Sequence, residues 1–349
     1  MFPCKRNSKQ GKPLLLQEVT VNIKSTASQS SYFTSVSAAE MAEQKPRKLT
    51  KKERAIQYWK TQNFVHNAVQ IVSKAAELCA ENIDELDDHI DLFNKMLHSI
   101  FFLGNIRDAQ FDPNLIFDDE EIFEEIRELF RGPFVKYSTE VAVRTPFSYF
   151  LDLVVSTSTN QEEMKTVLSD TLRQCKGSGI KCTLISSVIC ICEVSGKRYY
   201  GGSLSCPGDV EREIMTAVSC FQVWDNYVTS AVLSVFPEDR TEPVSMTLPS
   251  SVECRAYAIE NLSEVKAPCL RCHELYSLPN HSDNKNKPGN CAETEAISNL
   301  LTNEAEVKNG TRMNGPVLEE EYIQERMMHH FNSKINQGNY SINRIYESE

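Results

Sequence analysis

The chain has 349 residues, of which 41% are hydrophobic and 24% charged, and 37 lysines and arginines against 48 aspartates and glutamates give it a net charge of −11. This composition is typical of a globular protein, and no stretch approaches the roughly 18 uninterrupted apolar residues that a membrane-spanning helix needs. The first residues lead into polar sequence and not into an apolar segment. We therefore expect no secretory signal and no membrane partner.

The charge is divided unevenly along the chain. Residues 1–54 hold eleven basic and four acidic residues, a net charge of +7, which leaves −18 for the rest. An acidic body is a poor electrostatic match for a phosphate backbone, so a nucleic acid would have to contact the N-terminal segment or a local basic groove. The basic run Lys45–Arg54 fits either a nuclear address or a solvated lead into a helix. We expect a cytoplasmic or nuclear protein.

The N-terminal part of the chain predicts a tail followed by helices. Residues 1–47 are rich in Ser, Lys and Gln without hydrophobic periodicity, which predicts a disordered basic tail. Residues 48–158 predict an all-helical domain because apolar residues recur there at helical spacing. Its helices are expected over 65–79, 83–100 and 122–130, the last ending at Gly132-Pro133, and the apolar run 146–155 has no clear period.

Residues 159–305 predict an α+β domain, an α/β sandwich in which helices cover a small sheet. A capping box at Asn160 and Glu163 opens its first helix, and a strand signal over 182–194 turns into a second strand over 198–204, which makes a hairpin. The expected order continues with a helix from Asp209 that extends to Pro237, a strand over 252–259, and helices starting near Cys269 and Ala292. Residues 306–349 are expected to be a flexible tail containing one helix, 318–335.

The twelve cysteines are many for this length but far fewer than a disulfide scaffold carries. In a reducing compartment they indicate metal binding or catalysis and not disulfide bridges. Several stand among apolar neighbours and are best explained as small core residues, namely Cys79, Cys175, Cys190 and Cys192. Two short motifs remain, Pro268-Cys269-Leu270-Arg271-Cys272 and Cys291-Ala292-Glu293.

The two motifs together predict a three-thiolate metal site. A Cys-x-x-Cys pair that opens a helix places Cys269 and Cys272 on one side of the first turn, where both thiolates can share a metal. Cys291, at another helix start, can complete a three-cysteine site with one open position. Zinc bound in this way holds a water and lowers its pKa towards ~7. Glu293 need not be a ligand, since it can take the proton of that water and pass it to a leaving group.

These motifs resemble those of the cytidine deaminase superfamily, which includes nucleoside deaminases, APOBEC-like polynucleotide editors and bacterial toxin deaminases. The shared pattern is His-or-Cys-Ala-Glu at one helix start and Pro-Cys-x-x-Cys at another, and the hairpin over 182–204 is similar to the first two strands of that fold. The resemblance implies zinc ligands at Cys269, Cys272 and Cys291 and a catalytic proton carrier at Glu293. It also implies a nucleobase-containing small molecule or a single-stranded nucleic acid as substrate.

The order of the motifs departs from the family, in which the Ala-Glu motif comes first. Here it follows the Cys-x-x-Cys motif across a polar loop, 279–289. A loop of about ten residues can span ~30 Å, so the two helix starts can still meet. The place directly after the hairpin, where the family has its Ala-Glu motif, holds Cys206 and Glu211 at a different spacing.

Other interpretations of the same residues stay open. Cys269, Cys272 and Cys291 could form a closed structural zinc site with His273 or His281 as fourth ligand, or they could be unmetallated thiols. In a deaminase the bound base would need an aromatic wall, for which the candidates are Tyr199, Tyr200, Trp224 and Tyr276. The alternative to an enzyme is an interaction scaffold with a structural zinc, whose helical domain and C-terminal helix would bind a protein partner.

Overall fold

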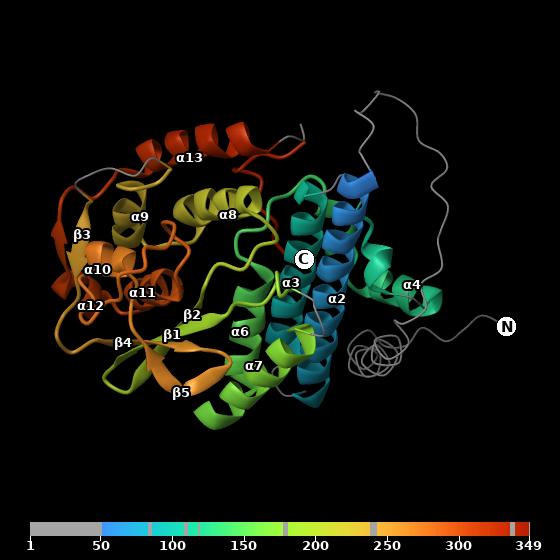
Figure 1. Cartoon of the computed structure of the whole chain (residues 1–349), viewed down its shortest axis with the longest axis horizontal. Coiled ribbons are helices and arrows are strands. Elements are labelled where there is room, and N and C mark those ends of the chain that lie inside the picture. Colours follow the sequence, from blue (N-terminus) through green and yellow to red (C-terminus); the bar gives the residue numbers. More distant parts are fainter. Residues whose placement is uncertain are drawn as a thin grey trace.

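The structure, a computed structural model, describes residues 51–82, 86–107, 111–117, 119–176, 181–237, 243–335 and 339–348. The tail predicted over 1–47 lies outside these ranges. Within them the chain is a mixed structure of helices and small antiparallel sheets, which confirms the α+β prediction (Figure 1). None of the helices in these ranges is long and apolar enough to cross a membrane.

The N-terminal part is helical, as predicted. It comprises α2 (Lys51–Glu81), α3 (Leu86–Arg107), the short 3₁₀ helix η2 (Pro113–Ile116), α4 (Glu120–Leu129) and α5 (Arg131–Lys136). Gly132-Pro133 was expected to end a helix, but it lies inside the first turn of α5. Proline is tolerated there because the first backbone N–H groups of a helix have no partner within it.

Helices α6 (Pro146–Thr157) and α7 (Gln161–Lys176) follow. Eight of the twelve residues of α6 are buried, including all six from Pro146 to Leu151, which explains why its sequence shows no amphipathic period. The predicted capping box opens α7, where the Asn160 side chain accepts hydrogen bonds from the backbone N–H groups of Glu162 and Glu163, both at 3.0 Å. The Glu163 carboxylate in turn accepts from the backbone N–H of Thr159 at 2.7 Å.

The main sheet has four strands in the order β2-β1-β4-β5, and all neighbours are antiparallel. The predicted hairpin is formed by β1 (Val188–Val194) and β2 (Lys197–Gly202). Its turn residues Ser195 and Gly196 have φ angles of 50° and 81°, as a tight two-residue hairpin turn requires. Strand β1 begins six residues later than predicted. The remaining strands are β4 (Glu253–Ala258), β5 (Asn261–Lys266), β3 (Ser245–Thr247) and β6 (Arg312–Asn314), of which only β4 was predicted.

The single helix predicted from Asp209 towards Pro237 is two helices, α8 (Asp209–Gln222) and α9 (Asn226–Leu233). Asp225 separates them because its carboxylate caps α9, accepting from the backbone N–H of Tyr227 at 2.9 Å. The backbone N–H of Asp225 donates to the Ser298 hydroxyl at 2.8 Å. This long-range bond fixes the break, and the local apolar pattern does not reveal it.

Helices α10 (Leu270–Tyr276) and α11 (Ala292–Asn303) start where predicted, and α11 packs on β1 and β2 (Figure 1). The approach to β2 is so close that a Cβ atom on Gly201 would lie 2.3 Å from the backbone nitrogen of Ala296. Only glycine fits at this position. The backbone of α11 therefore packs directly against the backbone of strand β2.

The segment 306–349 was predicted to be a flexible tail with one helix, but its described residues are packed into the fold. They include α12 (Ala305–Gly310), β6 and α13 (Glu320–Lys334), which corresponds to the predicted helix. Helix α13 packs against α8, and Met327, Phe331 and Ile342 are fully buried. One hydrophobic core includes residues of this segment, of the helical part and of the sheet.

The C-terminal segment also packs against α3 through a buried histidine. The rings of His98 and Tyr346 stack with centroids 3.8 Å apart and planes within 5°. Burial lowers the pKa of His98 from 6.5 to about 3. The neutral ring is therefore the form that the folded protein accommodates.

We expect this burial to make stability depend on pH. Because the folded-state pKa lies below the unfolded value, the contribution of His98 is complete above pH 6.5 and is lost progressively as pH falls towards 3. At pH 5 the loss is about 2 kcal/mol. His98→Phe keeps a stacking ring that cannot titrate, so urea unfolding at pH 8 and pH 5 should show a smaller pH loss for the variant. Equal losses would contradict this account.

Candidate metal centre

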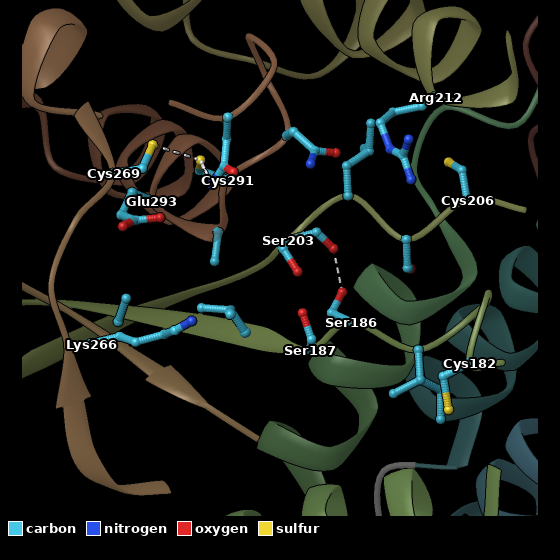
Figure 2. A pocket seen from close by; sticks show the side chains of 18 of the residues that line it. Cys182, Ser186, Ser187, Ser203, Cys206, Arg212, Lys266, Cys269, Cys291 and Glu293 are labelled. Atoms are coloured by element: carbon cyan, nitrogen blue, oxygen red, sulfur yellow. Dashed lines mark hydrogen bonds between the residues drawn. The ribbon is translucent and has the colours of Figure 1, made fainter. Parts of the chain in front are cut away.

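The three cysteines of the two motifs meet at the starts of two helices. Cys269 is the N-cap residue of α10, Cys272 lies in its first turn, and Cys291 is the N-cap residue of α11. The Sγ atom of Cys269 is 3.7 Å from that of Cys272 and 3.4 Å from that of Cys291, and all three lie within 4.8 Å of one another. Figure 2 shows Cys269 and Cys291 facing each other, with Glu293 beside them.

This buried group could hold a metal ion. Metal–sulfur bonds of ~2.3 Å in a tetrahedral arrangement place neighbouring sulfur atoms about 3.8 Å apart. The Cys269–Cys272 separation is close to that value and the Cys269–Cys291 separation is slightly shorter, so the three thiols are near enough to one another to hold one ion. Cys269, Cys272 and Cys291 are the one group of three or more candidate ligands found in the described part of the chain.

Hydrogen-bond donors around Cys269 Sγ favour its thiolate form, whereas the contacts with Cys269 and burial raise the pKa values of Cys272 and Cys291. Contacts with the other two thiols, and with the backbone N–H groups of Asn286 and Cys272, lower the pKa of Cys269. The side-chain amide of Asn286 donates to Cys291 Sγ at 3.3 Å. Donors of this kind orient cysteine ligands and stabilise their negative charge in metal sites.

The loop between the two helices brings the thiols together. Ser277, which ends α10, has a φ angle of 54°, and Asn280 and Gly289 follow with 56° and 74°. The loop then folds back on the start of α10, where Ser282 donates its backbone N–H to the carbonyl of Pro268 at 2.8 Å. This return path delivers Asn286 and then Cys291 to Cys269, which explains how the reversed motif order is compatible with one group.

Glu293 lies next to the thiols but outside the ligand group. Its side chain is buried, with 5% of the residue exposed. Burial and the nearby charge of Cys269 raise the pKa of Glu293, while Lys266 lowers it. The carboxyl group is thus held in the wall of a pocket beside the thiols.

Glu295, one turn into α11, anchors this helix to the rest of the fold. Its carboxylate accepts from the backbone N–H of Gly202 at 2.8 Å and from the Arg144 guanidinium at 3.0–3.1 Å. The same guanidinium is paired with Asp152 of α6. The two carboxylates raise the pKa of the largely buried Arg144, which therefore stays charged. The sequence carries no signal for this role of Glu295, because Gly202 and Arg144 lie 93 and 151 residues away in the chain.

The histidines considered as a fourth ligand lie elsewhere. The rings of His273 and His281 pack against each other with centroids 4.2 Å apart, and His273 Nδ1 contacts the Leu278 carbonyl at 2.9 Å. Neither histidine joins the thiol group. Cys206 is also outside it, on the opposite side of the pocket (Figure 2). The closed site with His273 or His281 as fourth ligand is not the observed arrangement.

The thiol group opens onto a polar pocket of about 720 Å³. Cys269, Cys291 and Glu293 form part of its wall, while Ser186, Ser187 and Ser203 lie across its middle (Figure 2). The tyrosines and the tryptophan proposed as an aromatic wall do not line it. Tyr276 is buried behind the site with its hydroxyl on Thr294, Trp224 packs on Gly289, and the Tyr199 hydroxyl is bonded to Glu304.

A comparison of the chain with family models, curated proteins and solved structures finds no match. The site is therefore interpreted from its own geometry.

We expect the purified protein to bind one metal ion per chain through the three thiols. Cys291→Ser should lower the affinity about 100-fold or more, because even the loss of a residue that only hydrogen-bonds to a metal ligand costs about 10- to 100-fold. Cys206→Ser, in a pocket cysteine outside the group, is the matched control and should retain the ion. Elemental analysis and competition with a chelator measure both. Equal metal content in the two variants would show that the group is not the binding site.

We also expect Arg144 and Glu295 to be coupled energetically. Arg144→Met leaves two acidic groups without their partner and should lower the free energy of unfolding by about 3–5 kcal/mol. Combining it with Glu295→Gln should cost less than the two single changes together. Urea denaturation of all variants gives the coupling energy. As a control, Arg127→Gln breaks an exposed ion pair with Glu124 and should lower the free energy of unfolding by less than about 1 kcal/mol. Additive effects of the changes at Arg144 and Glu295 would contradict the coupling.

Proposed function

We propose that the protein is a zinc-dependent hydrolytic deaminase that acts on a nucleobase-containing compound, built on a cytidine deaminase-like fold. The observation that carries this proposal is the arrangement of three thiols, without a fourth protein ligand in the described residues, beside Glu293 in the wall of a pocket. A structural zinc site closes its fourth position with protein, whereas a catalytic site keeps that position open.

The ligand set favours zinc. Three cysteine sulfurs are soft ligands, and tetrahedral sites rich in thiolate are typical of zinc or of iron–sulfur clusters. Cys269, Cys272 and Cys291 would hold the ion. When bound, zinc would supply a Lewis acid and lower the pKa of a water at its open position.

Glu293 would move the proton in the reaction. Glu293 lines the pocket beside Cys269 and Cys291. A carboxyl group whose pKa is raised by burial can accept a proton from water and return it to a departing amine. Water attack at the amino-bearing carbon of the base followed by release of ammonia would complete the hydrolysis.

Asn290 is positioned to orient the base. It lines the pocket directly before Cys291, and its Oδ1 atom is buried without a hydrogen-bond partner among the described residues. A buried acceptor of this kind is costly unless a ligand satisfies it. An exocyclic amino group of a bound base is a suitable donor. A hydrogen bond from the base to Asn290 would add selectivity where the described lining residues provide no aromatic wall.

We expect Glu293→Ala to abolish ammonia release while leaving metal content and folding unchanged. Loss of a positioned proton carrier should reduce the rate about 10²- to 10⁴-fold. Glu293→Gln keeps the shape without the proton and should be equally inactive. Ammonia release is measured with a panel of nucleosides and nucleoside monophosphates, with metal content and circular dichroism as controls.

Glu306→Ala removes an exposed carboxylate of α12 and serves as the matched control. It should keep the full rate. The proposal is wrong if Glu293→Ala retains activity, or if X-ray absorption shows four protein ligands on the bound ion.

A further inference from the structure

The pocket concentrates positive charge in a protein that is otherwise acidic. Beyond residue 54 the chain holds 26 basic and 44 acidic residues. The pocket wall holds four basic side chains, Lys176, Lys181, Arg212 and Lys266, and within the described residues Glu293 is its one acidic member. A concave site lined by one sign of charge attracts a ligand of the opposite sign.

The basic side chains are spread over the pocket and do not all surround Glu293. Arg212 comes from α8, and Figure 2 shows it on the other side of Ser203 from Cys291 and Glu293. Lys181 and Lys176 also line the pocket, and Lys176 is paired with Glu260. Lys266, at the end of β5, lies nearest to Glu293. Positive charge is thus available at the end remote from the proposed reaction centre.

Arg212 has a donor left for a ligand. One of its terminal nitrogens, Nη1, donates to Asp209 at 2.5 Å, which fixes the side chain at the edge of the pocket. Its Nε–H is buried and has no hydrogen-bond partner among the described residues. A guanidinium N–H without a protein acceptor is well suited to a phosphate oxygen.

We propose that the compound bound in this pocket is a nucleoside monophosphate, with its base at Glu293 and its phosphate at Arg212. This inference rests on the proposed function, because the base is assigned to the Glu293 end. Ser186, Ser187 and Ser203 lie between the two ends. The Ser186 hydroxyl donates to the Ser203 carbonyl, and the hydroxyls of Ser187 and Ser203 would contact the sugar. A volume of about 720 Å³ lies within the range of sites for single small molecules.

A single nucleotide fits the charge distribution better than a nucleic acid strand. A strand needs a continuous positive track for its successive phosphates. The described body is acidic outside the pocket, and the Asp209 carboxylate stands next to Arg212 at its edge. Asp209 pairs with both Arg212 and Lys287, so the charge at this edge is partly neutralised. The basic side chains of the pocket wall are enough for one phosphate group.

The test measures, by calorimetry, the affinity of the full-length, metal-loaded protein for each nucleoside 5′-monophosphate and for the corresponding nucleoside. At least one monophosphate should bind roughly 10- to 100-fold more tightly than its nucleoside, which is the effect of a charge-assisted hydrogen bond. Arg212→Gln should remove this preference and leave nucleoside affinity unchanged, whereas Arg212→Lys should keep part of it. Equal affinity for both compounds, or a preference that survives Arg212→Gln, would overturn the inference.

Controls separate the phosphate contact from folding. Arg173→Gln changes an exposed arginine of α7 outside the pocket and should retain the full preference. If Arg212→Gln does not fold, Lys181→Gln, at an exposed side chain of the same pocket, should weaken monophosphate binding alone. A single-stranded decanucleotide should bind no more tightly than the monophosphate. Tighter binding with a steep salt dependence would replace the mononucleotide by a nucleic acid strand.

The outcome also distinguishes this inference from the proposed function. If monophosphates bind with the Arg212-dependent preference but release no ammonia, the nucleotide site stands and the deaminase proposal fails. If nucleosides are deaminated and phosphate adds no affinity, the deaminase proposal stands and the nucleotide inference fails.

Discussion

The position of helix α11 depends on one buried charge cluster. Arg144 joins Glu295 of α11 to Asp152 of α6, and Glu295 also accepts the backbone N–H of Gly202 at the end of β2. A buried arginine is stable only when its charge and its donors are matched, so this cluster admits one arrangement of helix and strand. Because Cys291 and Glu293 lie in the same helix start, their places relative to the sheet follow from it.

The second determinant is the loop from Ser277 to Cys291. It contains three residues with left-handed backbone conformations and returns along the start of α10, where its backbone bonds to Pro268 and Leu270. Two cysteine motifs that are separated in the sequence become one buried group through this return. The donors from Asn286 then come from the loop itself, so one segment both closes the distance and supplies the hydrogen bonds to sulfur.

Features encoded by neighbouring residues could be predicted from the sequence. The β1–β2 hairpin, the capping box of α7, and the starts of α10 and α11 depend on contacts within a few positions. The break at Asp225, the strands β3, β5 and β6, and the packing of Met327 and Phe331 depend on partners far away in the chain or on short polar strands without alternation. For the same reason the cysteines of the site were identifiable from their spacing, whereas Arg212, Lys266 and Glu295 acquire their roles only from residues that folding brings beside them.

The close seat of α11 on strand β2 also limits how the pocket can change shape. With no side chain at Gly201, the backbones of helix and strand are in direct contact, and neither can slide along the other without a clash. The pocket wall that carries Cys291 and Glu293 is therefore held rigidly against the sheet. The segment after β2 is tied to the same wall, because the backbone N–H of Leu204 donates to the Asn290 carbonyl, directly before Cys291, at 3.0 Å.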